Sequence, residues 1–220
     1  VDTPPPAPTS TPEPAPASPA PAPPTIEPTA RLFRFSVAQY QQLGRTGILT
    51  TDDRVELIEG LVVQKMTKYE RHIATTKRIF RSIDRILPEG WHAGKEDPIL
   101  LDRSEPEPDV SVIRGGIDDY LNRKPVVTDL ALVVEVADSS YAFDRRKGAI
   151  YAEAGIPVCW IANLNADRIE AYSDPTGPDP TPEYRARRDY ARGEELPLIL
   201  DGQEVARLAV EALLAPNPPR

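Results

Sequence analysis

Apolar residues follow a helical period in some segments of the chain and form short, nearly continuous runs in others. Residues 69–87 carry apolar side chains every three or four positions, which predicts an amphipathic helix. Its expected buried positions are Ile73, Thr76, Phe80, Ile83 and Leu87. Further helices are expected at residues 35–43, 144–154 and 205–214. The first has capping-box spacing between Ser36 and Gln39, and the second ends before Gly155, a predicted C-cap.

The short apolar runs predict strands. These are residues 98–101, 110–113, 130–136, 158–162 and 168–172. Residues 55–63 predict a hairpin that turns at Glu59 and Gly60, where glycine supplies a positive φ. The helix at 144–154 separates two strands and so predicts a parallel β-α-β unit. The expected fold class is therefore α/β, a central mixed sheet flanked by helices.

Composition divides the chain into a tail and one domain. Residues 1–30 hold 12 of the 26 prolines and little apolar material, which predicts a disordered Pro/Ala-rich tail that is dispensable for folding. Residues 31–214 suit one domain, and 215–220 are expected to fray. Cys159 is the single cysteine, predicted to be buried, and no apolar run is long enough for a membrane span. A cytoplasmic location without membrane contact is expected.

The charge is distributed unevenly along the chain. The formal net charge is −8, yet basic residues dominate from position 65 to 85. The basic residues of this segment are Lys65, Lys68, Arg71, Lys77, Arg78, Arg81 and Arg85, against Glu70 and Asp84. Lys77, Arg81 and Arg85 repeat every four residues, so they share one helical face. That face is either a phosphate-contacting surface or a solvated one.

Two of the strand-like runs carry an acidic residue each. Asp109 directly precedes the run at 110–113, and Glu135 interrupts the apolar run at 130–136. A carboxylate in such a strand costs several kcal/mol unless it is paired or bound to a metal. Lys147 follows Asp144 by one helical turn and is expected to point back toward the strand ends. Two acids and a lysine are the groups that metal-dependent phosphodiester hydrolysis requires.

An ordered set of short motifs surrounds these residues. In chain order they are Glu56-Leu57-Ile58-Glu59-Gly60, His72, Pro108-Asp109-Val110-Ser111-Val112, Leu132-Val133-Val134-Glu135-Val136, Asp144, Lys147, Tyr151, Ala154-Gly155-Ile156-Pro157 and Trp160. From about residue 33 to 214 the chain resembles the Uma family of putative restriction endonucleases, within the PD-(D/E)XK nuclease superfamily. The resemblance implies a restriction-endonuclease-like fold and a metal-dependent DNA endonuclease.

The same resemblance implies the roles of individual residues. Asp109 and Glu135 become the catalytic acids and metal ligands, with Glu56 as a third acid at the metal. Position 137 is alanine where the superfamily's Glu-X-Lys pattern has lysine, so Lys147 becomes the replacement from the following helix. The implied cofactor is Mg²⁺, with Mn²⁺ as a substitute, the partner is DNA, and the assembly is a homodimer.

Other interpretations stand beside this one. Asp109 could cap a strand, Lys147 could pair with Asp144 or Glu153 on the surface, and His72 is typical of a partly exposed polar residue. Tyr151 and Trp160 are expected in the core. The whole domain could be a catalytically inactive, nuclease-derived module for DNA binding or assembly. A sugar- or nucleotide-binding protein ranks lower, because no glycine-rich phosphate loop follows a strand.

The clustering of acids also suggests a consequence for stability. Carboxylates that share a site without a metal repel one another. We therefore expect neutralisation of Asp109 to leave the domain folded and to stabilise it.

Overall fold

The computed structural model describes residues 31–138 and 140–217. The chain divides into Val1–Leu32 and Phe33–Arg220, and every element below belongs to the second unit. The tail expected at 1–30 lies outside the described residues, as do residues 218–220 of the expected frayed end. Ala215 is buried, and its N–H donates to Thr75 Oγ1 at 3.1 Å.

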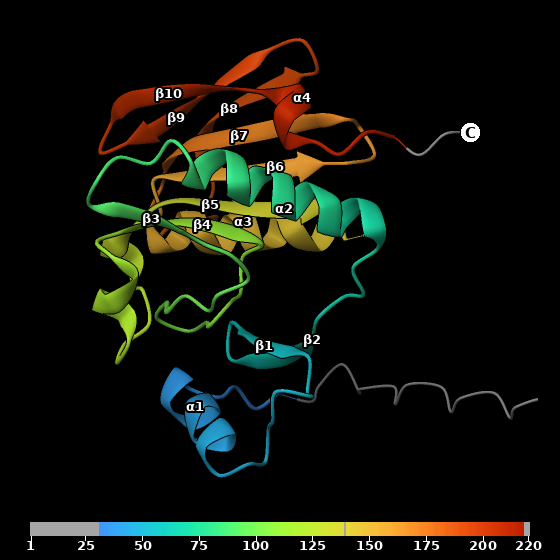
Figure 1. The fold of residues 1–220 in the computed structure, drawn as a ribbon. Helices are drawn as coiled ribbons and strands as arrows, with labels where there is room; N and C mark the ends of the chain where they lie inside the picture. The colour runs from blue at the N-terminus through green and yellow to red at the C-terminus, as the bar shows by residue number, and fades with distance from the viewer. Residues whose placement is uncertain (1–30, 139, 218–220) are drawn as a thin grey trace, which may run out of the picture. The chain divides into compact units, whose positions relative to one another are not determined.

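The described residues form four α-helices, two 3₁₀ segments and ten strands. Figure 1 shows their arrangement. The helices are α1 (Val37–Arg45), α2 (Glu70–Asp84), α3 (Tyr141–Ala154) and α4 (Val210–Leu213), with η1 (Ile117–Tyr120) and η2 (Val127–Asp129). The strands are β1 (Val55–Ile58), β2 (Leu61–Gln64), β3 (Trp91–Gly94), β4 (Val110–Arg114), β5 (Leu130–Ala137), β6 (Val158–Asn163), β7 (Arg168–Pro175), β8 (Tyr184–Ala191), β9 (Glu195–Leu200) and β10 (Gln203–Ala209). None of the helices in these residues has the length and apolarity to cross a bilayer.

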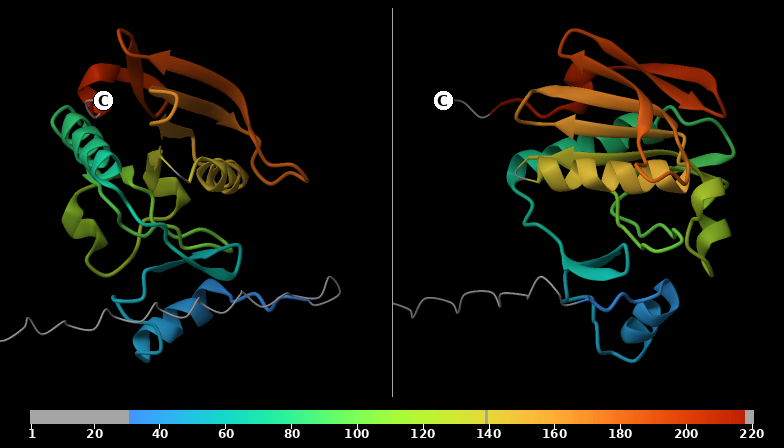
Figure 2. Two further views of the ribbon diagram at one scale, coloured as in Figure 1. Left: turned by 90° about the vertical axis from the view of Figure 1, so that its right-hand side faces the viewer. Right: turned by 180° about the vertical axis from the view of Figure 1, so that it is seen from behind.

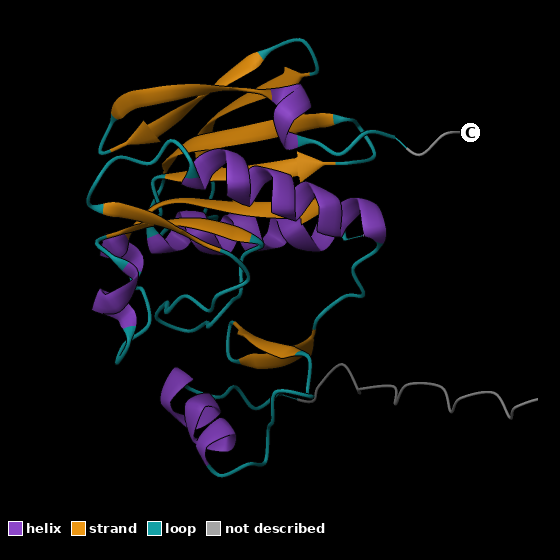
Figure 3. Ribbon diagram, viewed as in Figure 1, coloured by secondary structure: helices purple, strands orange, loops and turns teal. Residues whose placement is uncertain are grey.

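The central sheet has six strands in the order β3-β4-β5-β6-β7-β8 (Figure 3). β5 and β6 are parallel and connected through α3, while the other neighbouring pairs are antiparallel. The expected mixed sheet and its β-α-β unit are therefore confirmed. β1 pairs with β2, and β9 with β10, as separate two-stranded sheets.

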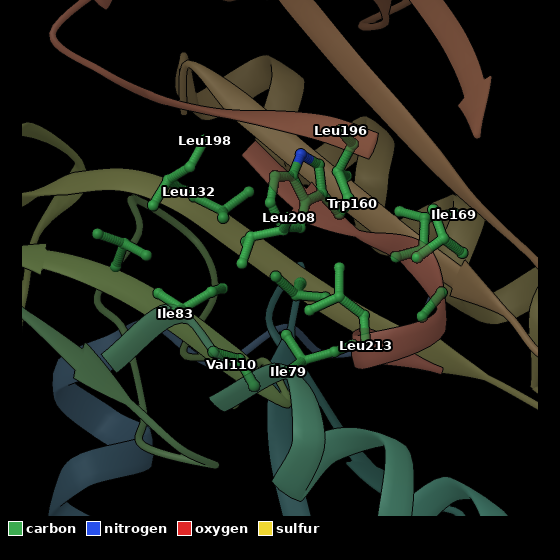
Figure 4. Close-up of a cluster of buried hydrophobic side chains, with 14 of the residues drawn as sticks. Ile79, Ile83, Val110, Leu132, Trp160, Ile169, Leu196, Leu198, Leu208 and Leu213 are labelled. Atoms are coloured by element: carbon green, nitrogen blue, oxygen red, sulfur yellow. The ribbon is translucent and has the colours of Figure 1, made fainter. Parts of the chain in front are cut away.

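Each face of the central sheet has its own hydrophobic core. Alternate residues of a strand point to opposite faces, so Val134 packs with α2 while Val133 packs with α3. The α2 face also receives Leu198 and Leu208 from the β9–β10 hairpin (Figure 4). The two long helices thus cover opposite faces of the sheet (Figure 2).

Local signals in the sequence located several elements. The capping box of Ser36 and Gln39 is present at α1. The hairpin turn has φ of 49° at Glu59 and 79° at Gly60, both left-handed. A Cβ at Gly60 would lie 2.7 Å from Arg34 Cβ, so glycine is required there for space as well as for φ. Gly155 also adopts the left-handed conformation that ends α3.

Three sequence expectations about elements are wrong. Residues 98–101 form only a bridge between Leu100 and Val126. The helix expected at 205–214 is mostly strand β10, which pairs with β9 and leaves only α4 helical. Ile73, expected to be buried, is 40% exposed, because the buried stripe of α2 is rotated by one position toward His72. Strands β3, β8 and β9 were not expected at all.

Candidate active site

Asp109 lies directly before β4, beside β5, and is nearly inaccessible to solvent. Its Oδ2 accepts the Val136 N–H at 2.8 Å and lies 3.3 Å from His72 Nε2. Its Oδ1 accepts a bond from Lys68 Nζ at 2.7 Å. Burial by itself would raise the pKa of Asp109, but His72 and Lys68 outweigh it and lower the pKa to about 2. Asp109 is therefore an ionised carboxylate, and both of its oxygens have hydrogen-bond or ion-pair partners.

Glu135 lies one strand away, in the middle of fully buried β5. Its Oε1 is 2.8 Å from Lys147 Nζ and accepts the Tyr151 hydroxyl at 2.5 Å. Burial raises the pKa of Glu135 to about 8, and the Lys147 ammonium only partly offsets that effect. Burial would lower the pKa of Lys147, but the carboxylates of Glu135 and Glu56 raise it above its usual value, so this lysine is charged.

Glu56 reaches the site from β1, outside the central sheet. Its Oε2 lies 3.3 Å from Lys147 Nζ and accepts the Glu107 N–H at 3.0 Å. The β1–β2 hairpin is held in place by a backbone bond from Glu105 N–H to Leu57 O at 2.8 Å. Lys147 therefore contacts both acids, which rules out the surface pairing with Asp144 or Glu153.

These residues line one cleft of about 1650 Å³. Asp109, Glu135 and Lys147 form part of its wall, and Glu56 lines it from β1. Exposed apolar side chains also line it, namely Met66, Tyr69, Ile73 and Leu121. Of the predicted basic face, Lys77 lines the cleft, whereas Arg81 is exposed farther along α2 and Arg85 is exposed at its C-cap. The candidate catalytic residues therefore share one cleft.

The family model for Uma2, described as "Putative restriction endonuclease", matches residues 37–211. The chain belongs to the Uma2 family. The resemblance inferred from the motifs is therefore confirmed, and with it a restriction-endonuclease-like nuclease family.

A solved structure supports the fold of this Uma2 chain. It is a putative nuclease belonging to DUF820 from Anabaena variabilis ATCC 29413, with a TM-score of 0.64. The two share 16% sequence identity, over 81% of this chain and 97% of the other. At that identity the likeness concerns the fold, which is the α/β architecture expected. No curated protein matches the chain.

Four buried acids outnumber the cations around them. Glu56, Asp109, Glu135 and Asp144 are each at most 6% exposed. Lys147 and the half-buried Lys68 are the ammonium groups in contact with them. Among residues 31–138 and 140–217, no three His, Cys, Asp or Glu side chains are grouped as a metal cluster. Mg²⁺ needs only one or two carboxylates because it keeps several waters, so this oxygen-rich donor set fits such an ion.

Sequence reasoning missed part of this site. His72 is 7% exposed rather than partly exposed, because α2 turns it inward against Asp109, and Thr76 Oγ1 lies 3.4 Å from its Nδ1. Asp144 is buried, which raises its pKa to about 6, and it accepts the Ser140 hydroxyl at 2.5 Å. The spacing of His72 and Thr76 by one helical turn was the available signal for an inward face. Tyr151 is a core residue as expected, yet its hydroxyl belongs to the site.

Proposed function

We propose that this protein is a metal-dependent DNA endonuclease that hydrolyses phosphodiester bonds at the cleft containing Asp109, Glu135 and Lys147. The observation that carries the proposal is that two buried acids, one directly before β4 and one in β5, line that cleft together with a buried lysine of α3. Burying such groups is costly. Their shared position on the wall of one cleft, in a chain of a nuclease family, favours chemistry over a purely structural role.

Asp109 and Glu135 would hold Mg²⁺, or Mn²⁺ in its place, with Glu56 as the third acid. Such an ion, when bound, polarises a phosphoryl oxygen and acidifies a water molecule. His72 and the Val136 N–H fix the orientation of the Asp109 carboxylate, and Tyr151 fixes that of Glu135. Lys147 keeps its charge beside the acids and stabilises negative charge that develops on the phosphate.

The second candidate is a catalytically inactive module that binds DNA or a protein assembly. One observation favours it: Lys147 is in contact with both Glu56 and Glu135, and Lys68 with Asp109. Acids neutralised by lysines in this way are stable without a metal. The two candidates therefore differ in whether a divalent ion binds.

Metal binding and DNA nicking, measured on the same preparations, test the proposal. Wild type should bind Mn²⁺ in calorimetry and nick supercoiled plasmid with Mg²⁺ but not with EDTA. Asp109→Asn should lose nicking, and Asp84→Asn, at an exposed acid on α2, should behave as wild type. If Asp109→Asn nicks plasmid as fast as Asp84→Asn, the reaction does not depend on this site. Wild type that binds no Mn²⁺ and cuts nothing supports the inactive module.

The proposal includes DNA as the substrate, a homodimer as the assembly and the cytoplasm as the location. DNA follows from the nuclease family, and Lys77 at the cleft supplies a cation for phosphate contact. The homodimer rests on the restriction-endonuclease-like fold, in which pairing places one site on each strand of a duplex. Scattering measurements of the molecular mass in solution test the assembly directly.

A further inference from the structure

Lys68 lies on the side of the site that is open to the cleft. It precedes α2, and its Nζ lies 2.7 Å from Asp109 Oδ1 and 2.7 Å from Glu96 Oε1. Its side chain is 25% exposed and lines the cleft, whereas that of Lys147 is 5% exposed. Lys68 therefore lies between Asp109 and the solvent of the cleft, where an incoming ligand would meet it.

The other oxygen of Asp109 has no room for a further partner. Oδ2 has the Val136 N–H and His72 Nε2 as neighbours, which use its two lone pairs. Oδ1 is thus the oxygen available to an incoming cation, and Lys68 is bound to it. A divalent ion and an ammonium group on one carboxylate oxygen repel each other strongly in a partly buried site.

Glu96 is the second ion-pair partner of Lys68. Glu96 follows β3 with φ of 60°, a left-handed conformation that is unfavourable for a residue with a Cβ. A backbone bond from Glu96 N–H to Asp109 O at 3.3 Å keeps the two residues side by side. The Glu96 side chain is 38% exposed at the cleft, so an ammonium bonded to it alone faces the cleft.

We propose that Lys68 is a displaceable cation, which neutralises Asp109 without metal and, when a divalent ion takes Asp109, remains on Glu96 and binds a DNA phosphate. This inference rests on the metal-dependent function proposed above and adds a phosphate-contacting residue to it. Lys147, in contrast, stays with Glu56 and Glu135 on the inner side of the site.

Opposite changes in metal affinity test the displacement. Lys68→Gln removes the competitor and should tighten Mn²⁺ binding at least about fivefold in calorimetry. Glu96→Gln removes the second partner of Lys68 and should weaken Mn²⁺ binding. Lys65→Gln is the matched control, because Lys65 lines the same cleft but pairs with Glu107. It reports the long-range effect of losing one positive charge, and melting curves confirm that each variant is folded.

Duplex DNA binding tests the phosphate contact. With Ca²⁺ present, Lys68→Gln should reduce the slope of log affinity against log salt by about 1, and with EDTA it should not change the slope. A Lys68→Gln variant that binds Mn²⁺ no more tightly than Lys65→Gln overturns the displacement, and an unchanged slope in Ca²⁺ overturns the phosphate contact. Wild type that binds Mn²⁺ with these shifts but never nicks DNA contradicts only the endonuclease. Wild type without Mn²⁺ affinity overturns both proposals.

Discussion

Lys147 Nζ lies 2.8 Å from Glu135 Oε1, although the lysine belongs to α3 and the glutamate to β5. Ala137, two residues after Glu135 on the same strand, is completely buried among the α3-face core residues. A lysine at position 137 would have to replace that packing. Instead, α3 follows β5 along the chain, packs on one face of the sheet and carries the lysine. The ammonium group therefore reaches Glu135 without a second charged residue in the core of β5.

Asp109→Asn should destabilise the metal-free protein by about 1–3 kcal/mol at pH 7, because a charge-assisted network around Lys68 and His72 is lost. This reverses the expectation drawn from clustered carboxylates alone. The folded pKa of Asp109, about 2, lies below its ordinary value of 3.8. Its contribution is therefore present above pH 4 and is lost as the pH falls toward 2. Urea denaturation in EDTA at several pH values measures it, and a variant more stable than wild type at pH 7 contradicts the prediction.

Glu135→Gln should change how stability depends on pH. The ordinary pKa of a glutamate, which applies to the unfolded chain, is 4.5, whereas burial raises the pKa of Glu135 in the folded protein to about 8. Folding therefore favours the protonated form, and wild type should lose stability as the pH rises from about 5 to 8. The variant should lack that decline and exceed wild type at pH 8.5. Glu89→Gln, at an exposed position, is the control. Parallel stability curves for wild type and Glu135→Gln would show that Lys147 keeps Glu135 ionised throughout.

At pH 8.5, where Glu135 is ionised, Lys147→Met should leave Glu56 and Glu135 buried without their cation and cost about 3–5 kcal/mol in EDTA. We expect the variant to retain Mn²⁺ binding but to lose plasmid nicking, because the lysine acts on charge at the phosphate. Mn²⁺ should raise its melting temperature more than that of wild type. Thermal melts with and without Mn²⁺ provide the measurement. Equal melting temperatures of the variant and wild type in EDTA would contradict the prediction.

The triple replacement of Lys77, Arg81 and Arg85 by glutamine should weaken DNA binding regardless of sequence. If all three contact phosphates, the slope of log affinity against log salt should fall by about 3. A control triple variant replaces Arg185, Arg188 and Arg207, which are exposed on β8 and β10. A fall of about 1 would point to Lys77 alone, the one that lines the cleft. No change, with circular dichroism intact, would make this face a solvated one.

Elements with a strong local signal were predictable, and elements formed by partners distant in sequence were not. The β1–β2 turn and the end of α3 follow from glycines whose left-handed φ is a local requirement. The β9–β10 hairpin was missed because Val205 and Leu208 suit a helical spacing as well as a strand. Pairing with β9 decides between them, since only the strand buries Leu208 on the α2 side of the sheet.

The sequence by itself determined the family through its ordered motifs and the fold class through its hydrophobic pattern. It also indicated Asp109 and Glu135 as candidate acids, because an acid in or beside an apolar run is visible locally. Only the tertiary structure decided which charges meet. Lys68 and Asp109 are 41 residues apart, and Glu56 and Lys147 are 91 apart. Ion pairs of this kind depend on how α2 and the β1–β2 hairpin pack, which no local pattern encodes. The same packing turns His72 inward and raises the pKa of Glu135, since burial and neighbouring charge exist only in the folded chain.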